Sequence, residues 1–114
     1  MSKLDQNKTP LFTVLKDEYV RRDILPFHVP GHKRGKGVDK EFYSFMGEAP
    51  FSIDVTIFKM VDGLHHPKSC IKEAQELVAD AYGVKHSFFA VNGTSGAIQA
   101  MICLLYTSLM ARGR

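Results

Sequence analysis

Residues 87–101 read SFFAVNGTSGAIQAM, and this stretch decides the fold that the sequence predicts. The apolar run at 87–91 is typical of a strand buried on both faces, as in a parallel sheet covered by helices. The turn at 92–96 is rich in Gly, Ser and Thr, and from Ala97 onward apolar residues recur at helical spacing. Because a strand, a turn and a helix follow in this order, we expect the opening of an α/β layered domain.

The turn NGTSG at 92–96 is a candidate phosphate site. Glycines let the backbone approach a ligand, Thr94 and Ser95 add hydroxyl donors, and the first amides of the following helix lack partners within it. We expect Thr94 or Ser95 to open a helix whose free amides point into a concavity. The turn matches neither the P-loop pattern nor GxGxxG, and an N-capped tight turn without a ligand is the alternative interpretation.

Two amphipathic helices are predicted upstream of this junction. Thr9 and Pro10 are helix-start signals that predict a helix over residues 10–22. Pro67 and Ser69 open a second helix, which Gly83 ends. The apolar stripe of this second helix has the spacing of a core face and consists of Ile71, Ala74, Leu77, Val78 and Ala81.

The segment between the two helices is predicted to be less regular. Prolines and glycines are dense at 26–37, which favours a loop over residues 27–38. Residues 41–46 fit a short helical turn. The β-branched residues at 51–58 indicate a weak strand or an extended segment.

Histidines form two candidate clusters. His28 and His32 have the spacing of metal ligands on one helix face, but the Pro-Gly pair between them disfavours a helix, so we expect no metal site. The basic loop at 32–36 is either a contact for phosphate groups or nucleic acid, or a solvated surface loop. His65 and His66 either line an active site or lie in the loop before the second helix.

The composition sets the broad class of the protein. A length of 114 residues, with 45% hydrophobic and 24% charged residues, is typical of one globular domain. A net charge of +3 is mild for nucleic-acid binding, and two cysteines are too few for a disulfide scaffold. The first ten residues lack the apolar core of a signal peptide, and the longest apolar run, at 97–110, is shorter than the roughly 20 residues of a membrane span. We expect a cytoplasmic protein that binds neither nucleic acid nor a membrane.

Five motifs stand in collinear order: FHVPGHKRGKG at 27–37, FSIDVT at 51–56, DGLHHP at 62–67, EAQELVADAYGV at 73–84 and FFAVNGTSGAIQAM at 88–101. Together they resemble the N-terminal part of the bacterial ornithine/lysine/arginine decarboxylases. These enzymes use pyridoxal 5′-phosphate and have the aspartate-aminotransferase fold, also called fold type I. The resemblance covers about residues 9–102.

This resemblance implies an N-terminal arm, a large cofactor-binding domain with a seven-stranded sheet, and a smaller C-terminal domain, assembled as a homodimer or higher homo-oligomer. It implies that the cofactor phosphate is held at the loop before the first helix of the large domain, which falls on Gly93, Thr94 and Ser95. It gives a role in lining the active site to His28, His32, His65 and His66. No lysine here lies in the motif whose lysine binds the cofactor covalently, so no catalytic residue is assigned and we expect this chain alone to be inactive.

On this basis the chain divides into three parts. Residues 1–50 are the expected N-terminal arm, and residues 51–102 begin the large domain with its first helix, strand and helix. Residues 103–114 are an expected non-native tail, because CLLYTS at 103–108 resembles the translation of an adapter used in DNA sequencing libraries. A divergent natural C-terminus is the alternative.

The function implied is decarboxylation of a basic amino acid in polyamine-type metabolism, with arginine, lysine and ornithine as alternative substrates. Other enzymes of the same fold, aminotransferases and lyases, share the phosphate loop, and only HVPGHK and DGLHHP favour a decarboxylase. A non-catalytic module that binds phosphate or nucleic acid through the basic loop is the alternative from a different class.

Overall fold

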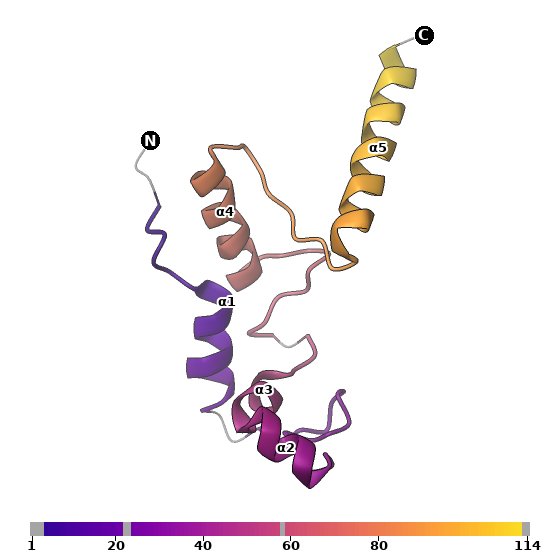
Figure 1. Cartoon of the computed structure of the whole chain (residues 1–114). Helices are drawn as coiled ribbons and strands as arrows, with labels where there is room; N and C mark the ends of the chain where they lie inside the picture. Colours follow the sequence, from indigo (N-terminus) through magenta and orange to yellow (C-terminus); the bar gives the residue numbers. More distant parts are fainter. Residues whose placement is uncertain (1–3, 22–23, 58, 113–114) are drawn as a thin grey trace.

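The computed structural model describes residues 4–21, 24–57 and 59–112. In chain order its helical elements are α1 (Pro10–Thr13), the π-helical turn η1 (Val14–Tyr19), α2 (Lys40–Met46), α3 (Glu48–Ile53), α4 (Cys70–Tyr82) and α5 (Gly93–Arg112). Figure 1 shows α1 beside α4, α2 beside α3, and α5 standing apart from the other helices.

The first predicted helix is present as α1 continued by η1. Pro10 occupies its first turn as expected, whereas the hydroxyl of Thr9 does not cap the backbone and lies 3.2 Å from that of Thr13 instead. The helix runs to Tyr19, and Arg22, its predicted end, lies outside the described residues. Tyr19 is fully buried and anchors this end of the helix.

The second predicted helix is confirmed as α4. Ile71 and Leu77 of its apolar stripe are buried against the rest of the chain, while Ala81 is exposed. Gly83 ends the helix in the left-handed region, at φ 64°, where glycine has no Cβ penalty. The loop predicted over 27–38 and the helical turn predicted over 41–46 are also confirmed, the latter as α2.

The predicted strand over 87–91 is wrong, and the weak strand or extended segment predicted over 51–58 is present only in part. Residues 87–91 are extended but belong to no strand, because the part of the chain that the structure describes offers them no neighbouring strand for hydrogen bonds. Residues 51–53 belong to α3, whose Phe51 is buried among aromatic rings. Asp54 is extended and 54–57 form no regular element, while residue 58 lies outside the described residues. The described residues therefore contain helices and an isolated bridge position at Val61, and the predicted α/β arrangement is not seen in them.

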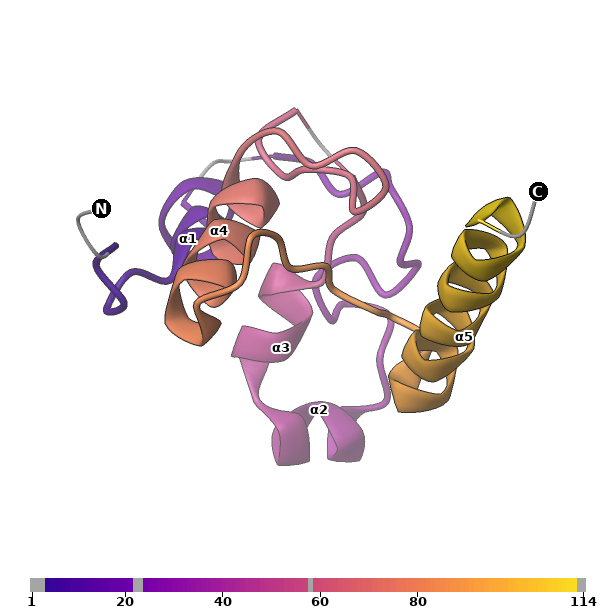
Figure 2. The same ribbon diagram turned by 90° about the horizontal axis from the view of Figure 1, so that it is seen from above.

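The described chain is less closely packed than a compact domain of its length. Its radius of gyration is 18.5 Å, against about 13 Å expected for 114 residues. Figures 1 and 2 show why, since α5 projects away from the other helices in both views. The apolar side chains of α5, from Ile98 to Met110, are exposed.

The length and apolar character of α5 bear on the expectation that the chain has no membrane span. Residues Gly93–Ala111 have a mean hydropathy of 1.3, so by length and composition this segment is long and apolar enough to cross a membrane. A core helix of a soluble protein also meets these criteria of length and composition.

Candidate active-site loops

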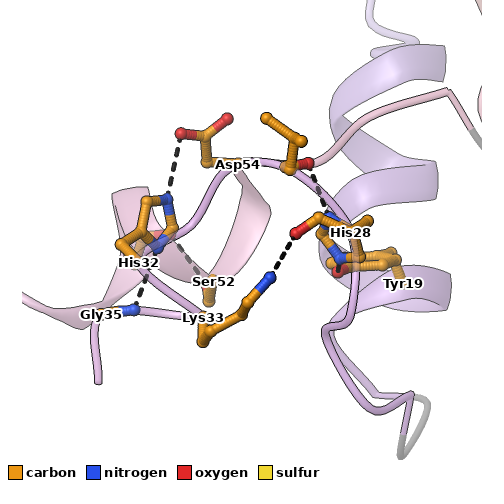
Figure 3. Close-up of polar contacts among 9 residues, drawn as sticks. Tyr19, His28, His32, Lys33, Gly35, Ser52 and Asp54 are labelled. Carbon is orange, nitrogen blue, oxygen red and sulfur yellow. Dashed lines mark hydrogen bonds and ion pairs between the residues drawn. The ribbon is translucent and has the colours of Figure 1, made fainter. Parts of the chain in front are cut away.

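The loop that follows η1 is organised around His28 (Figure 3). The Nδ1 atom of His28 lies 2.7 Å from the carbonyl oxygen of Val29, which accepts a hydrogen bond, so Nδ1 carries the proton. The Nε2 atom then accepts a bond from the buried Tyr19 hydroxyl at 2.9 Å. These two bonds fix one tautomer of the imidazole and connect the loop to the first helix.

His32 connects the same loop to the segment after α3. Its Nδ1 accepts a hydrogen bond of 3.1 Å from the amide of Gly35, so the proton is on Nε2, which donates to the Asp54 carboxylate at 3.2 Å. The His32 ring also packs edge-on against Phe51, with 5.4 Å between the ring centroids. The HVPGHK and FSIDVT motifs, far apart in the sequence, are therefore in direct contact (Figure 3).

The cationic side chains of the basic loop are directed inward. Lys33 donates a 2.7 Å hydrogen bond from Nζ to the carbonyl of His28, and the Arg34 guanidinium lies over the Tyr19 ring at 5.1 Å. Lys36, by contrast, is exposed. With two of its cations used within the fold, the loop does not present the continuous basic face that a nucleic-acid-binding module needs.

The backbone of this loop places strict demands on its residues. Lys33 and Arg34 adopt positive φ values of 49° and 58°, and Gly35 follows at 88°. A Cβ atom at Gly35 would lie 2.9 Å from Cδ2 of Tyr43 and would overlap Cε2 of the same ring. Tyr43 is in turn stacked on Phe51 at 5.3 Å, so only glycine fits at this position.

The DGLHHP loop is anchored by Asp62. Its carboxylate accepts hydrogen bonds from the amides of Lys68, Ser69 and Ile71 at 3.0, 2.5 and 3.2 Å, and from the Ser69 hydroxyl at 2.7 Å. Partial burial raises the pKa of Asp62, but the bonds from Ser69 and Lys68 outweigh it, so the pKa lies below its ordinary value. Asp62 therefore caps the start of α4, and Ser69 acts as a donor to it.

His65 and His66 lie in the loop that Asp62 closes, and both are exposed. The structure thus brings His28 and His32 together in one loop and places His65 and His66 in another, with the candidate phosphate residues in a third. Among the described residues there is no group of three or more His, Cys, Asp or Glu side chains that is suited to a metal ion.

The candidate phosphate site lies at the start of α5. Gly93 has a φ of 70°, and an added Cβ there would meet nothing within 4 Å. Gly93, Thr94 and Ser95 are exposed and form the first turn of this 20-residue helix, where backbone amides lack partners within the helix. A neighbouring hollow of about 530 Å³ is lined by residues 86–92 and by the α5 side from Gly96 to Leu104, and the three candidate residues are not part of its lining.

The sequence analysis gave no role in holding these loops to Tyr19, Asp54, Asp62 or Arg34. The signal for two of them was present, because Asp54 stands inside FSIDVT and Asp62 inside DGLHHP. Their roles depend on partners elsewhere in the chain, which a local pattern does not reveal.

The family model for the Orn/Lys/Arg decarboxylase major domain matches residues 9–110, which includes eight residues of the expected tail. The arginine decarboxylase of Bacillus anthracis is 50% identical over 102 residues, covering 90% of this chain and 20% of that protein. The arginine decarboxylase of Bacillus subtilis (strain 168) is 50% identical over 99 residues, covering 87% of this chain and 20% of that protein.

More distant relatives carry other substrate names. The constitutive ornithine decarboxylase of Escherichia coli (strain K12) is 32% identical over 110 residues, covering 90% of this chain and 15% of that protein. The chain spans about a fifth of the length of the arginine decarboxylases that it matches. No solved structure gives a significant match.

Proposed function

Because the chain belongs to the Orn/Lys/Arg decarboxylase family, we propose that it is part of an enzyme that decarboxylates a basic amino acid with the help of pyridoxal 5′-phosphate. The observation that carries this proposal is the family match over residues 9–110, joined to half identity with proteins named arginine decarboxylase. An aminotransferase or another lyase would share the phosphate loop but not this family match.

Arginine is the substrate that we favour. The relatives at 48–50% identity that carry a substrate name are arginine decarboxylases, whereas the relatives named for lysine and ornithine are 32–34% identical. Substrate choice within a family follows the contacts of the whole pocket, so closeness in sequence favours a shared substrate.

The residues at the start of α5 fit the phosphate of the cofactor. Gly93, Thr94 and Ser95 offer exposed backbone amides and two hydroxyls at the positive end of a long helix. When bound, pyridoxal phosphate supplies a ring that takes up the electron pair left as carbon dioxide departs. The contribution of this chain is to hold the phosphate, since the covalent lysine is not found in it.

The histidine loops are proposed to line the active site from the arm side. Hydrogen bonds to Tyr19, Gly35 and Asp54 hold His28 and His32, so their rings are fixed in orientation before a ligand arrives. His65 and His66 are exposed on a loop that Asp62 anchors, which leaves both rings free to face a ligand. A homodimeric or larger cytoplasmic enzyme with the fold type I sheet completes the proposal.

A chimeric enzyme tests this function. Residues 9–102 of this chain replace the aligned segment of the Bacillus subtilis arginine decarboxylase, and release of carbon dioxide from arginine, lysine and ornithine is measured with added pyridoxal phosphate. We expect release from arginine at a rate comparable with that of the parent enzyme. A soluble chimera that binds the cofactor but releases no carbon dioxide from any of the three amino acids contradicts the proposal.

The phosphate role is tested in the same chimera by Ser95→Ala combined with Thr94→Val. Removing both hydroxyls leaves the backbone amides in place, so we expect weaker cofactor binding, on the order of tenfold for each hydrogen bond to a charged group. Thr56→Val, an exposed hydroxyl on the extended segment after α3, is the matched control. Equal cofactor dissociation constants for the double variant and the control argue against a phosphate site here.

A further inference from the structure

The guanidinium of Arg34 has two buried donors without a partner. Its Nε and Nη2 atoms are buried, and neither has a hydrogen-bond partner in the structure. The group lies over the ring of Tyr19, 5.1 Å from the ring centroid. A cation over an aromatic face is stabilised by the ring, but that contact leaves the N–H donors unsatisfied.

The two unpartnered atoms belong to one edge of the guanidinium. The N–H groups on Nε and Nη2 point in parallel, in the fork that pairs with both oxygens of a carboxylate. Buried donors in proteins nearly always have an acceptor, so an orphaned pair on one edge indicates a partner that is supplied from outside the described chain.

The surrounding loop holds this edge in place. Arg34 and Lys33 both have positive φ values, and Gly35, whose position admits no side chain, follows them. The Lys33 ammonium is bound to the carbonyl of His28, and His32 donates to Asp54, so these two side chains are already engaged. Arg34 differs from these two side chains because, although it lies over the Tyr19 ring, two of its donors have no hydrogen-bond partner in the structure.

Charge balance selects the kind of oxyanion. One guanidinium neutralises one negative charge, and the adjacent residue in the sequence, Lys33, donates to the carbonyl of His28. A carboxylate leaves no net charge in this half-buried position, whereas a phosphate dianion leaves an excess negative charge that burial penalises.

We propose that Arg34 is a carboxylate-binding residue, which takes both oxygens of a carboxylate on its Nε–Nη2 edge while stacked on Tyr19. The ligand locks the HVPGHKRG loop to the first helix. This site is separate from the phosphate residues at the start of α5, and it does not depend on the proposed enzymatic activity.

The test follows the Nε–H resonance of Arg34 by nuclear magnetic resonance in the 114-residue chain. Sodium acetate is titrated at constant ionic strength against sodium chloride, and sodium phosphate is titrated in parallel. We expect a saturable downfield shift with acetate, half-complete on the order of 1 mM, since two charge-assisted hydrogen bonds form together. Chloride alone is expected to produce no saturable shift.

Two variants make the result specific. Arg34→Lys keeps the charge but removes the fork, so acetate affinity, read from the Gly35 amide, is expected to fall at least about tenfold. Arg21→Lys is the matched control, because Arg21 is exposed and paired with Asp17 at 3.3 Å. An unchanged acetate affinity in Arg34→Lys overturns the assignment to the guanidinium.

Dilution of the wild-type chain distinguishes the source of the carboxylate. A shift of the Arg34 resonance that depends on protein concentration without acetate, and that persists in Leu105→Lys, whose apolar α5 surface is interrupted, identifies an Asp or Glu of a second copy as the ligand. A shift that appears only with acetate identifies a free carboxylate. Absence of both shifts, or a response to phosphate with none to acetate, overturns the proposal.

Discussion

Replacing Asp62 by alanine should release the first turn of α4. The carboxylate accepts hydrogen bonds from the backbone amides of Lys68, Ser69 and Ile71 and from the Ser69 hydroxyl, at 2.5–3.2 Å. Losing an N-terminal cap costs about 0.5–2 kcal/mol, and because several donors lose their acceptor together we expect a value of about 1–2 kcal/mol. The opening equilibrium of this turn then rises about five- to thirtyfold.

Amide hydrogen exchange measures this opening directly and residue by residue. In Asp62→Ala the protection of the first-turn amides of α4 should fall by that factor, while α2 is unchanged. Asp39→Ala is the matched control, because Asp39 caps α2 through the amides of Glu41 and Phe42 at 3.0 and 3.1 Å. Unchanged protection in α4, or an equal loss in both helices, refutes the assignment of Asp62 as the cap.

The same cap predicts a pH dependence. Hydrogen bonds from Ser69 and Lys68, which outweigh partial burial, lower the pKa of Asp62 in the folded chain below its ordinary value of 3.8. A carboxyl group with a lowered folded pKa stabilises the fold fully above its unfolded pKa, and this stabilisation is lost as the pH falls through the folded value. Protection of the α4 first turn should therefore persist at pH 4 and decline below it, whereas Asp62→Asn should abolish this titration.

Three further outcomes are expected. Gly35→Ala should disorder the loop at a cost of about 1–2 kcal/mol or more, because the φ of residue 35 is 88° and a Cβ there would clash with Tyr43. The amide signal of residue 35 should then lose its dispersion. Gly31→Ala is the control, because an added Cβ at Gly31 meets nothing within 4 Å, and it should leave that signal in place. The isolated chain should self-associate in sedimentation experiments through the exposed apolar surface of α5, and Leu105→Lys should weaken that association. A wild-type chain that is monomeric at all concentrations would contradict this. The 114-residue chain should release no carbon dioxide from arginine, lysine or ornithine above a cofactor-only control, because none of its lysines lies in the motif that binds the cofactor covalently. Release above that control would show that a lysine of this chain does bind the cofactor.

Several features of this protein follow from the sequence alone. Apolar spacing and Gly83 predict the helix α4, and the prolines and glycines of 27–38 predict a loop there. These signals are local, because a helix closes its hydrogen bonds within four residues and a turn within three. The five collinear motifs likewise identified the family that the comparisons show.

The tertiary structure decided the rest, because the deciding contacts join distant residues. The apolar run at 87–91 has the composition of a strand, yet a strand forms only against a neighbour, and the described chain offers none. Likewise Asp54 reaches His32 across 22 positions, and Asp62 reaches the start of α4 across a loop. The composition of a segment determines which helix or turn it can form from its own residues. Contacts between segments depend on their positions in space, and only the folded chain determines those positions.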